Sequence, residues 1–227
     1  MKEARLETAL SAIEGSGLVA RGALRLEDSE RVGEFAEIRT IVLAGFAGRE
    51  GWSAFAASAE ASDGDDPLDR WSRRVIEALA LELGAKALFP FGEPPFWPFQ
   101  QWAMRAEPVH PSPIGILIHP RYGLWHSYRG ALGFREALDV PELEATPSPC
   151  DACRERPCLK TCPVGAFSVS SYDVAACTGY LKDAAGADCM GFGCRARRAC
   201  PVGVEHAYGA EQASFGMQAF LRAQAAR

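Results

Sequence analysis

The sequence predicts an α+β fold with a small cysteine-rich domain towards its C-terminal end. Two observations carry this prediction: helical and strand patterns are mixed along residues 1–149, and all eight cysteines lie in residues 150–227. The composition, 48% apolar and 23% charged, is that of an ordinary globular chain. A cysteine-free stretch of this length can bury its own hydrophobic core, which argues against a disulfide-stapled mini-protein. We expect an α+β domain at residues 1–145 and a cysteine domain at residues 146–227.

Periodic apolar residues define the elements of the first domain. Pro67 and Gly84 bracket the strongest helical pattern, in which Trp71, Val75 and Ile76 share one face. One strand-like run is almost wholly apolar, which suits a central strand of a sheet. The patterns predict helices at residues 2–14 and 67–83 and strands at residues 18–26, 40–44 and 86–91, with residues 40–44 as the central strand.

Residues 89–102 contain four prolines and six aromatic side chains. The prolines exclude a regular helix or a central strand across most of this segment, whereas the aromatic rings favour burial. We expect an ordered loop packed on the core; the alternative is a pocket wall or a lid.

Two apolar runs, residues 114–119 and 124–134, flank the sequence Pro120-Arg121-Tyr122-Gly123. Runs separated in this way predict a β-hairpin with a Pro/Gly turn. Three prolines within residues 141–149 predict the linker into the cysteine domain.

The formal charge of −5 is divided unevenly along the chain. Residues 1–149 carry 15 Lys/Arg and 22 Asp/Glu, and residues 150–227 carry 9 and 7. Neither part is basic enough to predict a nucleic-acid partner. No apolar run reaches the roughly 18–20 residues that span a bilayer, so no membrane partner is expected. The first residues lack the pattern of a secretory signal, and we expect a cytoplasmic protein, in which clustered cysteines indicate metal more often than disulfides.

The cysteines form two runs with the same ending. Both runs contain a C-x4-C step and end in Cys-Pro-Val-Gly, and these endings lie 38 residues apart, which indicates an internal repeat. The first run is Cys150-x2-Cys153-x4-Cys158-x3-Cys162-Pro, and the second is Cys177-x11-Cys189-x4-Cys194-x5-Cys200-Pro.

This pattern favours iron–sulfur clusters, because a four-iron cubane needs four thiolates and a Cys-Pro step suits the start of a helix. The chain resembles a bacterial-type ferredoxin with two [4Fe–4S] clusters over roughly residues 150–205. The family spacing C-x2-C-x2-C-x3-C-P is stretched here, most of all in the second run. The resemblance implies that the Cys-Pro cysteine of each run binds the cluster of the other. One cluster would be held by Cys150, Cys153, Cys158 and Cys200, and the other by Cys162, Cys177, Cys189 and Cys194.

Three alternatives stay open for the cysteines: one cluster with spare thiols, zinc, or disulfides. Structural zinc usually uses paired C-x2–4-C knuckles without Cys-Pro endings. Basic residues interleaved with the cysteines would temper the negative charge of clusters; they form either a solvated face or a docking surface for a redox partner. These residues are Arg154, Arg156, Lys160, Arg195, Arg197 and Arg198.

Two further stretches resemble known families. The stretch Tyr172-Asp-Val-Ala-Ala-Cys177-Thr-Gly-Tyr-Leu181 is similar to the segment between the cluster runs of epoxyqueuosine reductases, which are cobalamin-dependent iron–sulfur enzymes related to reductive dehalogenases. The stretch Ile118-His-Pro-Arg-Tyr-Gly-Leu-Trp125 with Arg129-Gly130 resembles a hairpin of the cobalamin-processing CblC-type proteins. Both families imply a nitroreductase-like first domain that holds a corrinoid without a histidine ligand from the protein. The sequence also lacks the D-x-H-x-x-G motif that supplies such a ligand.

The CblC-type resemblance places five candidate cofactor-binding residues in this stretch: His119, Tyr122, Gly123, Trp125 and Arg129. Each has a plain structural alternative. His119 precedes Pro120 and is therefore extended, and it either faces a cofactor or completes a turn. Gly123 serves the turn, Trp125 is a core residue or a ring-stacking wall, and Arg129 binds an anionic group or pairs with a carboxylate.

Three functions fit these observations. In the first, an enzyme passes single electrons from an unidentified donor through two [4Fe–4S] clusters to a cofactor, a corrinoid by resemblance, or to a small-molecule substrate in the first domain. In the second, the chain is an electron carrier whose first domain docks a partner. In the third, the cysteines bind zinc and shape an interaction surface. The sequence does not distinguish a corrinoid from a flavin.

Overall fold

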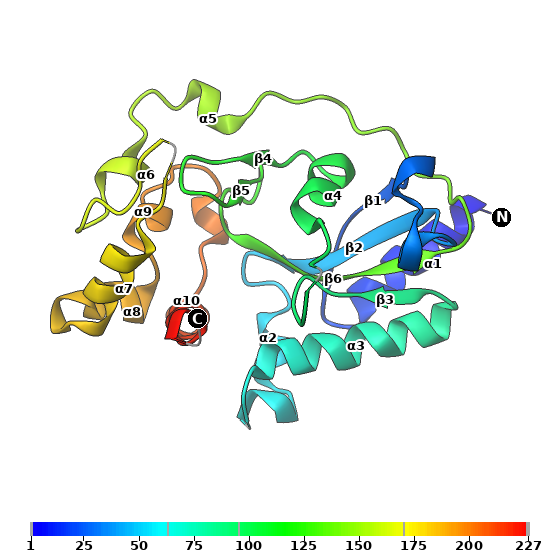
Figure 1. Cartoon of the computed structure of the whole chain (residues 1–227), viewed down its shortest axis with the longest axis horizontal. Coiled ribbons are helices and arrows are strands. Elements are labelled where there is room, and N and C mark those ends of the chain that lie inside the picture. Colours follow the sequence, from blue (N-terminus) through cyan, green and yellow to red (C-terminus); the bar gives the residue numbers. More distant parts are fainter. Residues whose placement is uncertain (1, 63, 95, 170, 226–227) are drawn as a thin grey trace. The chain divides into compact units, whose positions relative to one another are not determined.

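The computed structural model describes residues 2–62, 64–94, 96–169 and 171–225 (Figure 1). Helices and strands are mixed in it, which confirms the predicted α+β class. Among these residues, no helix combines the length and apolar character that crossing a membrane requires. The chain divides into two compact units: unit 1 is Met1–Pro108 with Ser127–Ala145, and unit 2 is Val109–His126 with Thr146–Arg227.

Unit 1 is built on a four-stranded sheet with the strand order β1-β2-β6-β3. All eight residues of β2 are buried, so the predicted central strand is confirmed. The outer pairs, β1 with β2 and β3 with β6, are antiparallel, and Ala20 to Ala23 form an irregularity in the first pair. The strands are β1 (Val19–Arg25), β2 (Thr40–Ala47), β3 (Lys86–Leu88) and β6 (His126–Phe134).

Helices cover this sheet, with α3 below it and α4 above it in Figure 1. The helix α3 begins at Pro67, and Gly84 ends it in the left-handed conformation at φ 60°, both as predicted. The predicted loop at residues 89–102 is in part wrong: helix α4 begins at Phe99, directly after the last proline, where a helix start tolerates the missing N–H. Pro95 of that segment lies outside the described residues. The helices of unit 1 are α1 (Lys2–Gly15), α2 (Trp52–Ala56), α3 (Pro67–Leu83) and α4 (Phe99–Ala106).

A buried ion pair lies inside unit 1. The guanidinium of Arg21, 1% exposed, donates to both carboxylate oxygens of Glu107 at 2.8 and 3.1 Å and to the carbonyl oxygen of Phe46 at 2.6 Å. The Tyr128 hydroxyl donates to the same carboxylate. Burial raises the pKa of Glu107, and Arg21 and Tyr128 oppose that shift. The network satisfies polar groups that would otherwise be costly to bury.

Unit 2 consists of short elements. The predicted β-hairpin between residues 114–119 and 124–134 is wrong: Leu117–Ile118 (β5) pairs with His110–Pro111 (β4), whereas β6 belongs to the sheet of unit 1. Of the predicted hairpin only the turn is present, closed by an isolated bridge between His119 and Gly123. The helices of unit 2 are α5 (Pro149–Ala152), α6 (Pro157–Lys160), α7 (Val174–Lys182), α8 (Ala187–Phe192), α9 (Arg195–Arg198) and α10 (Ala210–Ala225).

The core of unit 2 explains why residues 109–126 group with the cysteines and not with the first domain, where the sequence places them. Ile114, Ile118 and Leu124 are buried in one cluster with Ala196 and Cys200. Four further cysteines pack against this cluster: Cys150, Cys158, Cys162 and Cys194. The units include residues 109–126 with the cysteines and change again at residues 145 and 146, and the expected division into two domains stays a prediction.

Candidate metal centre

The eight thiols lie on the short helices of unit 2 or beside them, and all are free of disulfide bonds. We call Cys150, Cys153, Cys158 and Cys200 set one, and Cys162, Cys177, Cys189 and Cys194 set two. Prolines start the helices α5 and α6 that carry the first cysteines. The Asp173 carboxylate caps α7 by accepting from the backbone N–H of Ala176 at 2.8 Å, which fixes Cys177 one turn into that helix.

Electrostatic interactions between the thiols follow these two sets. Burial raises the pKa of Cys150, and negative charge on Cys200, Cys158 or Cys153 raises it further. The pKa of Cys177 is likewise raised by burial first, and then by Cys162 and Cys189. The same causes raise the pKa of Cys158, Cys194 and Cys200, and every thiol partner belongs to the same set. A ligand that neutralises thiolate charge would relieve this mutual repulsion.

Hydrogen-bond donors point at the sulfurs from several directions. The backbone N–H of Ala166 donates to the Cys162 sulfur at 3.4 Å. Backbone N–H groups of Ala196 and Arg197 lower the pKa of Cys194 against the larger effect of burial. Burial raises the pKa of Cys150 and Cys177, and the hydroxyl groups of Ser148 and Tyr172 oppose that shift. Donors of this kind stabilise thiolates and the clusters that thiolates bind.

The four thiols of set one surround a common space in unit 2. A small cavity of unit 2 is lined by all four thiols of set one together with Pro149, Pro157 and Pro201. In the part of the chain that the structure describes, no group of three or more His, Cys, Asp or Glu side chains is placed to hold a metal ion. Four thiols around one space are the arrangement that a cubane requires, because iron and sulfide fill the space between the cysteine sulfurs.

The two Cys-Pro-Val-Gly endings share a backbone conformation but not their surroundings. Gly165 and Gly203 both have left-handed φ angles, of 59° and 68°. A Cβ on Gly165 would meet nothing within 4 Å, whereas a Cβ on Gly203 would collide with the backbone of Tyr122 and Gly123. Gly123 in turn lies against the carbonyl of Val202. The Pro120–Gly123 turn is therefore in backbone contact with the second ending.

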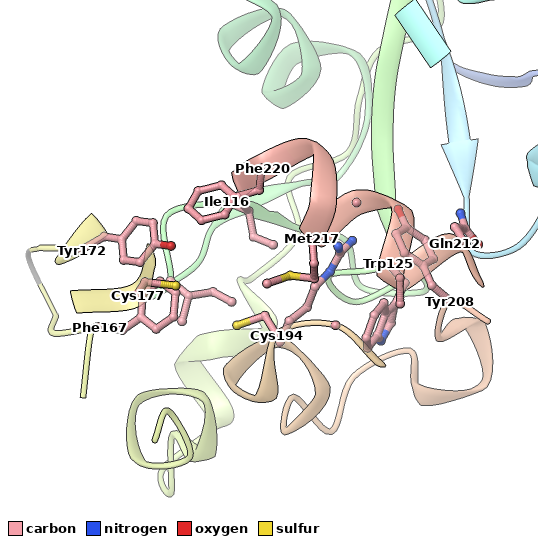
Figure 2. Close-up of a pocket in the computed structure, with 15 residues that line it drawn as sticks. Ile116, Trp125, Phe167, Tyr172, Cys177, Cys194, Tyr208, Gln212, Met217 and Phe220 are labelled. Atoms are coloured by element: carbon pink, nitrogen blue, oxygen red, sulfur yellow. The ribbon is translucent and has the colours of Figure 1, made fainter. Parts of the chain in front are cut away.

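A mostly apolar cavity of about 280 Å³ lies within unit 2, beside set two (Figure 2). Figure 2 shows Tyr172, Phe167 and Cys177 at one end and Trp125, Tyr208 and Gln212 at the other. Helix α10 supplies one wall, and Gly216 of that helix faces open space. The lining of this cavity includes Trp125, Phe167, Tyr172, Cys177, Cys194 and Tyr208.

The structure gives the candidate cofactor-binding residues of unit 2 contacts within the protein. The His119 Nδ1 accepts from the backbone N–H groups of Arg121 and Tyr122 at 3.0 and 3.3 Å, so this side chain completes the turn. The Tyr122 ring lies edge-on to the His206 ring at 4.9 Å. Trp125 is 4% exposed and packs edge-on against Tyr208 at 5.3 Å.

Arg129 belongs to unit 1, apart from the other four candidates. Its guanidinium pairs with the Asp69 carboxylate, donates to the Ser72 hydroxyl at 3.0 Å and lies 5.2 Å from the centre of the Phe91 ring. Each of these side chains therefore has contacts within the protein, and a role of the five candidates in binding a cofactor stays a prediction.

Sequence comparison gives no relatives: no protein-family model matches the chain, and no curated protein matches it. Solved structures do. A selenomethionine-labelled epoxyqueuosine reductase matches with a TM-score of 0.58 and 15% identity, over 94% of this chain and 69% of that one. An epoxyqueuosine reductase with an epoxyqueuosine-modified tRNA-Tyr stem loop matches with a TM-score of 0.55 and 15% identity, over 94% and 71%. The chain therefore shares the fold of these two epoxyqueuosine reductase structures, which supports in part the predicted relationship.

The expectation that the chain has no nucleic-acid partner is wrong. A structure with this fold contains a tRNA stem loop, and the present chain matches it over most of its length. Overall charge failed as a criterion because a fold can bind nucleic acid through a local surface while its net charge is negative.

Several residues of the centre carry no predicted role from sequence. Tyr172 lies in the stretch that resembles epoxyqueuosine reductases. Its effect on the pKa of Cys177 is visible only in the structure. Arg197 is expected on a solvated or docking face, but its guanidinium lies 4.8 Å from the Trp125 ring centre and 4.5 Å from that of Tyr208, and it donates to the Leu124 carbonyl at 3.0 Å. The spacing of the basic residues contains no signal for this packing.

Proposed function

We propose that the chain is an iron–sulfur redox protein in which unit 2 holds two [4Fe–4S] clusters, one on set one and one on set two. One observation carries the proposal: Cys200, from the end of the second run, lines one small cavity together with Cys150, Cys153 and Cys158 of the first run, as the interleaved ferredoxin pattern requires. Structural zinc sites usually present paired knuckles without the two Cys-Pro endings found here.

When bound, such clusters accept and release single electrons at potentials that the surrounding protein sets. The residues of unit 2 would hold the thiolates in place through the turns at both Cys-Pro-Val-Gly endings, donate hydrogen bonds to sulfur, and cover the sites with apolar side chains. The electrons would come from an unidentified donor and reduce a cofactor or a small-molecule substrate in the first domain. Binding of a corrinoid or a flavin in the first domain stays a prediction.

Metal analysis of the anaerobically purified full chain tests this proposal. About eight iron and eight sulfide per chain are expected, with reversible bleaching of the brown colour by dithionite. Colourless protein that contains zinc would contradict the proposal. About four iron per chain would reduce it to a single cluster.

The rival function is an electron carrier without catalytic activity of its own, and ligand binding separates it from an enzyme. Cobalamin and FMN are added in turn to the reduced protein, and their absorption spectra are followed. A saturable spectral shift supports a cofactor-dependent enzyme, and the absence of any shift supports the carrier, whose first domain would then dock a partner.

One structural neighbour also suggests a substrate class to test, namely tRNA. Because one structural neighbour was solved with a modified tRNA stem loop, we propose tRNA as a substrate to be tested beside small molecules. Retardation of tRNA by the holoprotein in a gel, weakened by added salt, supports this substrate class. No retardation at low salt would remove it.

A further inference from the structure

His119 closes the Pro120–Gly123 turn with its side chain as well as with its backbone. Its backbone N–H donates to the Gly123 carbonyl, and its carbonyl accepts from the Gly123 N–H, both at 2.8 Å. Its Nδ1 accepts from the backbone N–H groups of Arg121 and Tyr122 at 3.0 and 3.3 Å. A side-chain acceptor for the N–H two residues further on is the arrangement of an Asx turn, which Asn and Asp usually form. The His119 ring therefore takes the place of an Asn side chain in this turn.

The turn packs against the backbone that follows Cys200. A Cβ on Gly203 would collide with the backbone of Tyr122 and Gly123, and a Cβ on Gly123 would collide with the carbonyl of Val202. Backbone thus meets backbone at both glycines, with no flexible side chain between the two segments. A change in the shape of the turn must therefore displace the second Cys-Pro-Val-Gly ending.

The residue before His119 packs near Cys200 itself. Ile118 is 1% exposed and belongs to the same buried cluster as Cys200. Ile118 and Val202 also line the small cavity that the four thiols of set one surround. Residues 118–123 therefore support Cys200 in two ways, through the apolar packing of Ile118 and through the backbone contact with the ending.

The first Cys-Pro-Val-Gly ending is built differently. A Cβ on Gly165 would meet nothing within 4 Å, and the Gly165 N–H donates to the Cys162 carbonyl of the same ending at 3.1 Å. Cys162 is thus placed by its own loop. Cys200 is the one thiol of set one that comes from the second run, and a separate segment of the chain holds its ending. Ligands are commonly oriented by residues behind them in this way.

We propose that His119 is a positioning residue for the cluster on set one: its Nδ1 fixes the Pro120–Gly123 turn, and the turn holds Cys200 beside the other three thiols of that set. The inference rests on the proposed function, because it needs a cluster on set one. It deepens that function by naming a residue that is not a ligand but places the one ligand that joins the two runs.

The test is the stability of the clusters in the anaerobically purified full chain, measured as iron release into a chelator. His119→Leu removes the acceptor, and one of the two clusters should then release its iron roughly tenfold faster, because two hydrogen bonds of the turn are lost. His119→Asn should restore the wild-type rate, since its side-chain oxygen can accept from the same two N–H groups. A role of His119 in packing alone would not be rescued by Asn.

EPR spectra of the reduced variants identify the affected cluster. Cys200→Ser changes a ligand of set one and thereby marks the signal of that cluster. His119→Leu should alter the same signal and leave the other as in the wild type. His110→Leu is the matched control, because His110 also belongs to unit 2 but its ring contacts the Thr146 hydroxyl at 3.4 Å. This control should leave both signals and both rates of iron release unchanged.

Wild-type release rates and EPR signals in His119→Leu would overturn the inference and leave the proposed function intact. Equal damage in His119→Leu and His119→Asn would also overturn it, because the acceptor would then not matter. A wild-type chain without iron would instead overturn the proposed function.

If His119→Leu does not fold, hydrogen exchange of two ligand variants decides, because coupling between two sites is reciprocal. A cluster that is stabilised by the turn must stabilise the turn equally. The amides of Arg121 and Tyr122 should therefore exchange faster in Cys200→Ser than in Cys177→Ser. Equal exchange of these amides in the two variants would contradict the inference.

Discussion

Units 1 and 2 fill their interiors with different chemistry. In unit 1 every residue of β2 is buried, and Arg21 is paired with a carboxylate of its own unit. In unit 2 the apolar cluster around Ile118 includes Cys200 and packs against further thiols whose pKa is raised by burial and by one another. Unit 1 therefore pairs its buried charge internally, whereas unit 2 packs around thiols that the proposed function makes cluster ligands.

Cluster removal should produce the largest difference in stability between the two units. We expect ferricyanide with a chelator to abolish hydrogen-exchange protection throughout α5–α9, because ligand binding supplies much of the folding free energy of such a centre. The amides of β2 and α3 should keep their protection. Exchange mass spectrometry of the full chain, before and after treatment, measures both. Equal loss of protection in both units would contradict the difference drawn between them.

Removal of the buried charge partner in unit 1 should have the next largest effect. Glu107→Gln leaves the Arg21 guanidinium buried beside a neutral amide, and we expect a loss of about 3–5 kcal/mol of stability. Hydrogen exchange of the β2 amides measures this loss of stability. The iron content of the protein should stay unchanged. The matched control is Glu37→Gln, whose exposed pair with Arg135 should contribute no more than about 1 kcal/mol. Similar effects of the two substitutions would contradict the role of the network.

The two Cys-Pro-Val-Gly endings sharpen the comparison inside unit 2. Gly165→Ala should cost about 1–2 kcal/mol, from the left-handed backbone alone. Gly203→Ala adds a collision with the backbone of Tyr122 and Gly123, and we expect a further cost of about 1–3 kcal/mol. Thermal denaturation of the two holoproteins under anaerobic conditions compares them. If Gly165→Ala is the more damaging variant, the contact between the Pro120–Gly123 turn and the second ending is not stabilising.

The smallest predicted effect is a pH dependence at the surface of unit 1. The hydrogen bond from Arg74 is the main cause that lowers the pKa of Glu60 from the usual 4.5 to about 2. A lowered pKa in the folded state means that this pair stabilises unit 1 above pH 4.5 and that the stabilisation is lost as the pH falls towards 2. A carbon NMR titration of the Glu60 carboxyl should report the low value, and Arg74→Ala should return it towards 4.5. An unchanged titration in Arg74→Ala would contradict this assignment.

Local signals in the sequence predicted the features that depend on neighbouring residues. Helix α3 begins at Pro67 and stops before Gly84 because both residues act on the backbone where they stand. The grouping of the thiols, still a prediction as a ligand set, comes from cysteine spacing and the two Cys-Pro steps. The fully buried strand β2 was recognisable because it is almost wholly apolar.

Features that depend on distant residues were missed or predicted wrongly. The apolar runs beside Pro120 resemble a hairpin, but the second run finds its partners in the sheet of unit 1, and residues 109–126 pack on the thiol region instead. The stacking of Arg197 on Trp125 joins two residues whose sequence patterns contain no sign of each other. Charge balance failed for nucleic acid for the same reason, since it describes the whole chain and not one surface.

The iron content of two double variants tests the central claim most directly, namely that the two thiol sets are interleaved. Cys162→Ser with Cys177→Ser removes two ligands of one set, so about four iron per chain should remain. Cys162→Ser with Cys150→Ser removes one ligand from each set, and neither cluster should assemble fully. If the first variant loses all its iron while the second keeps about four, each run holds its own cluster and the interleaved account is wrong.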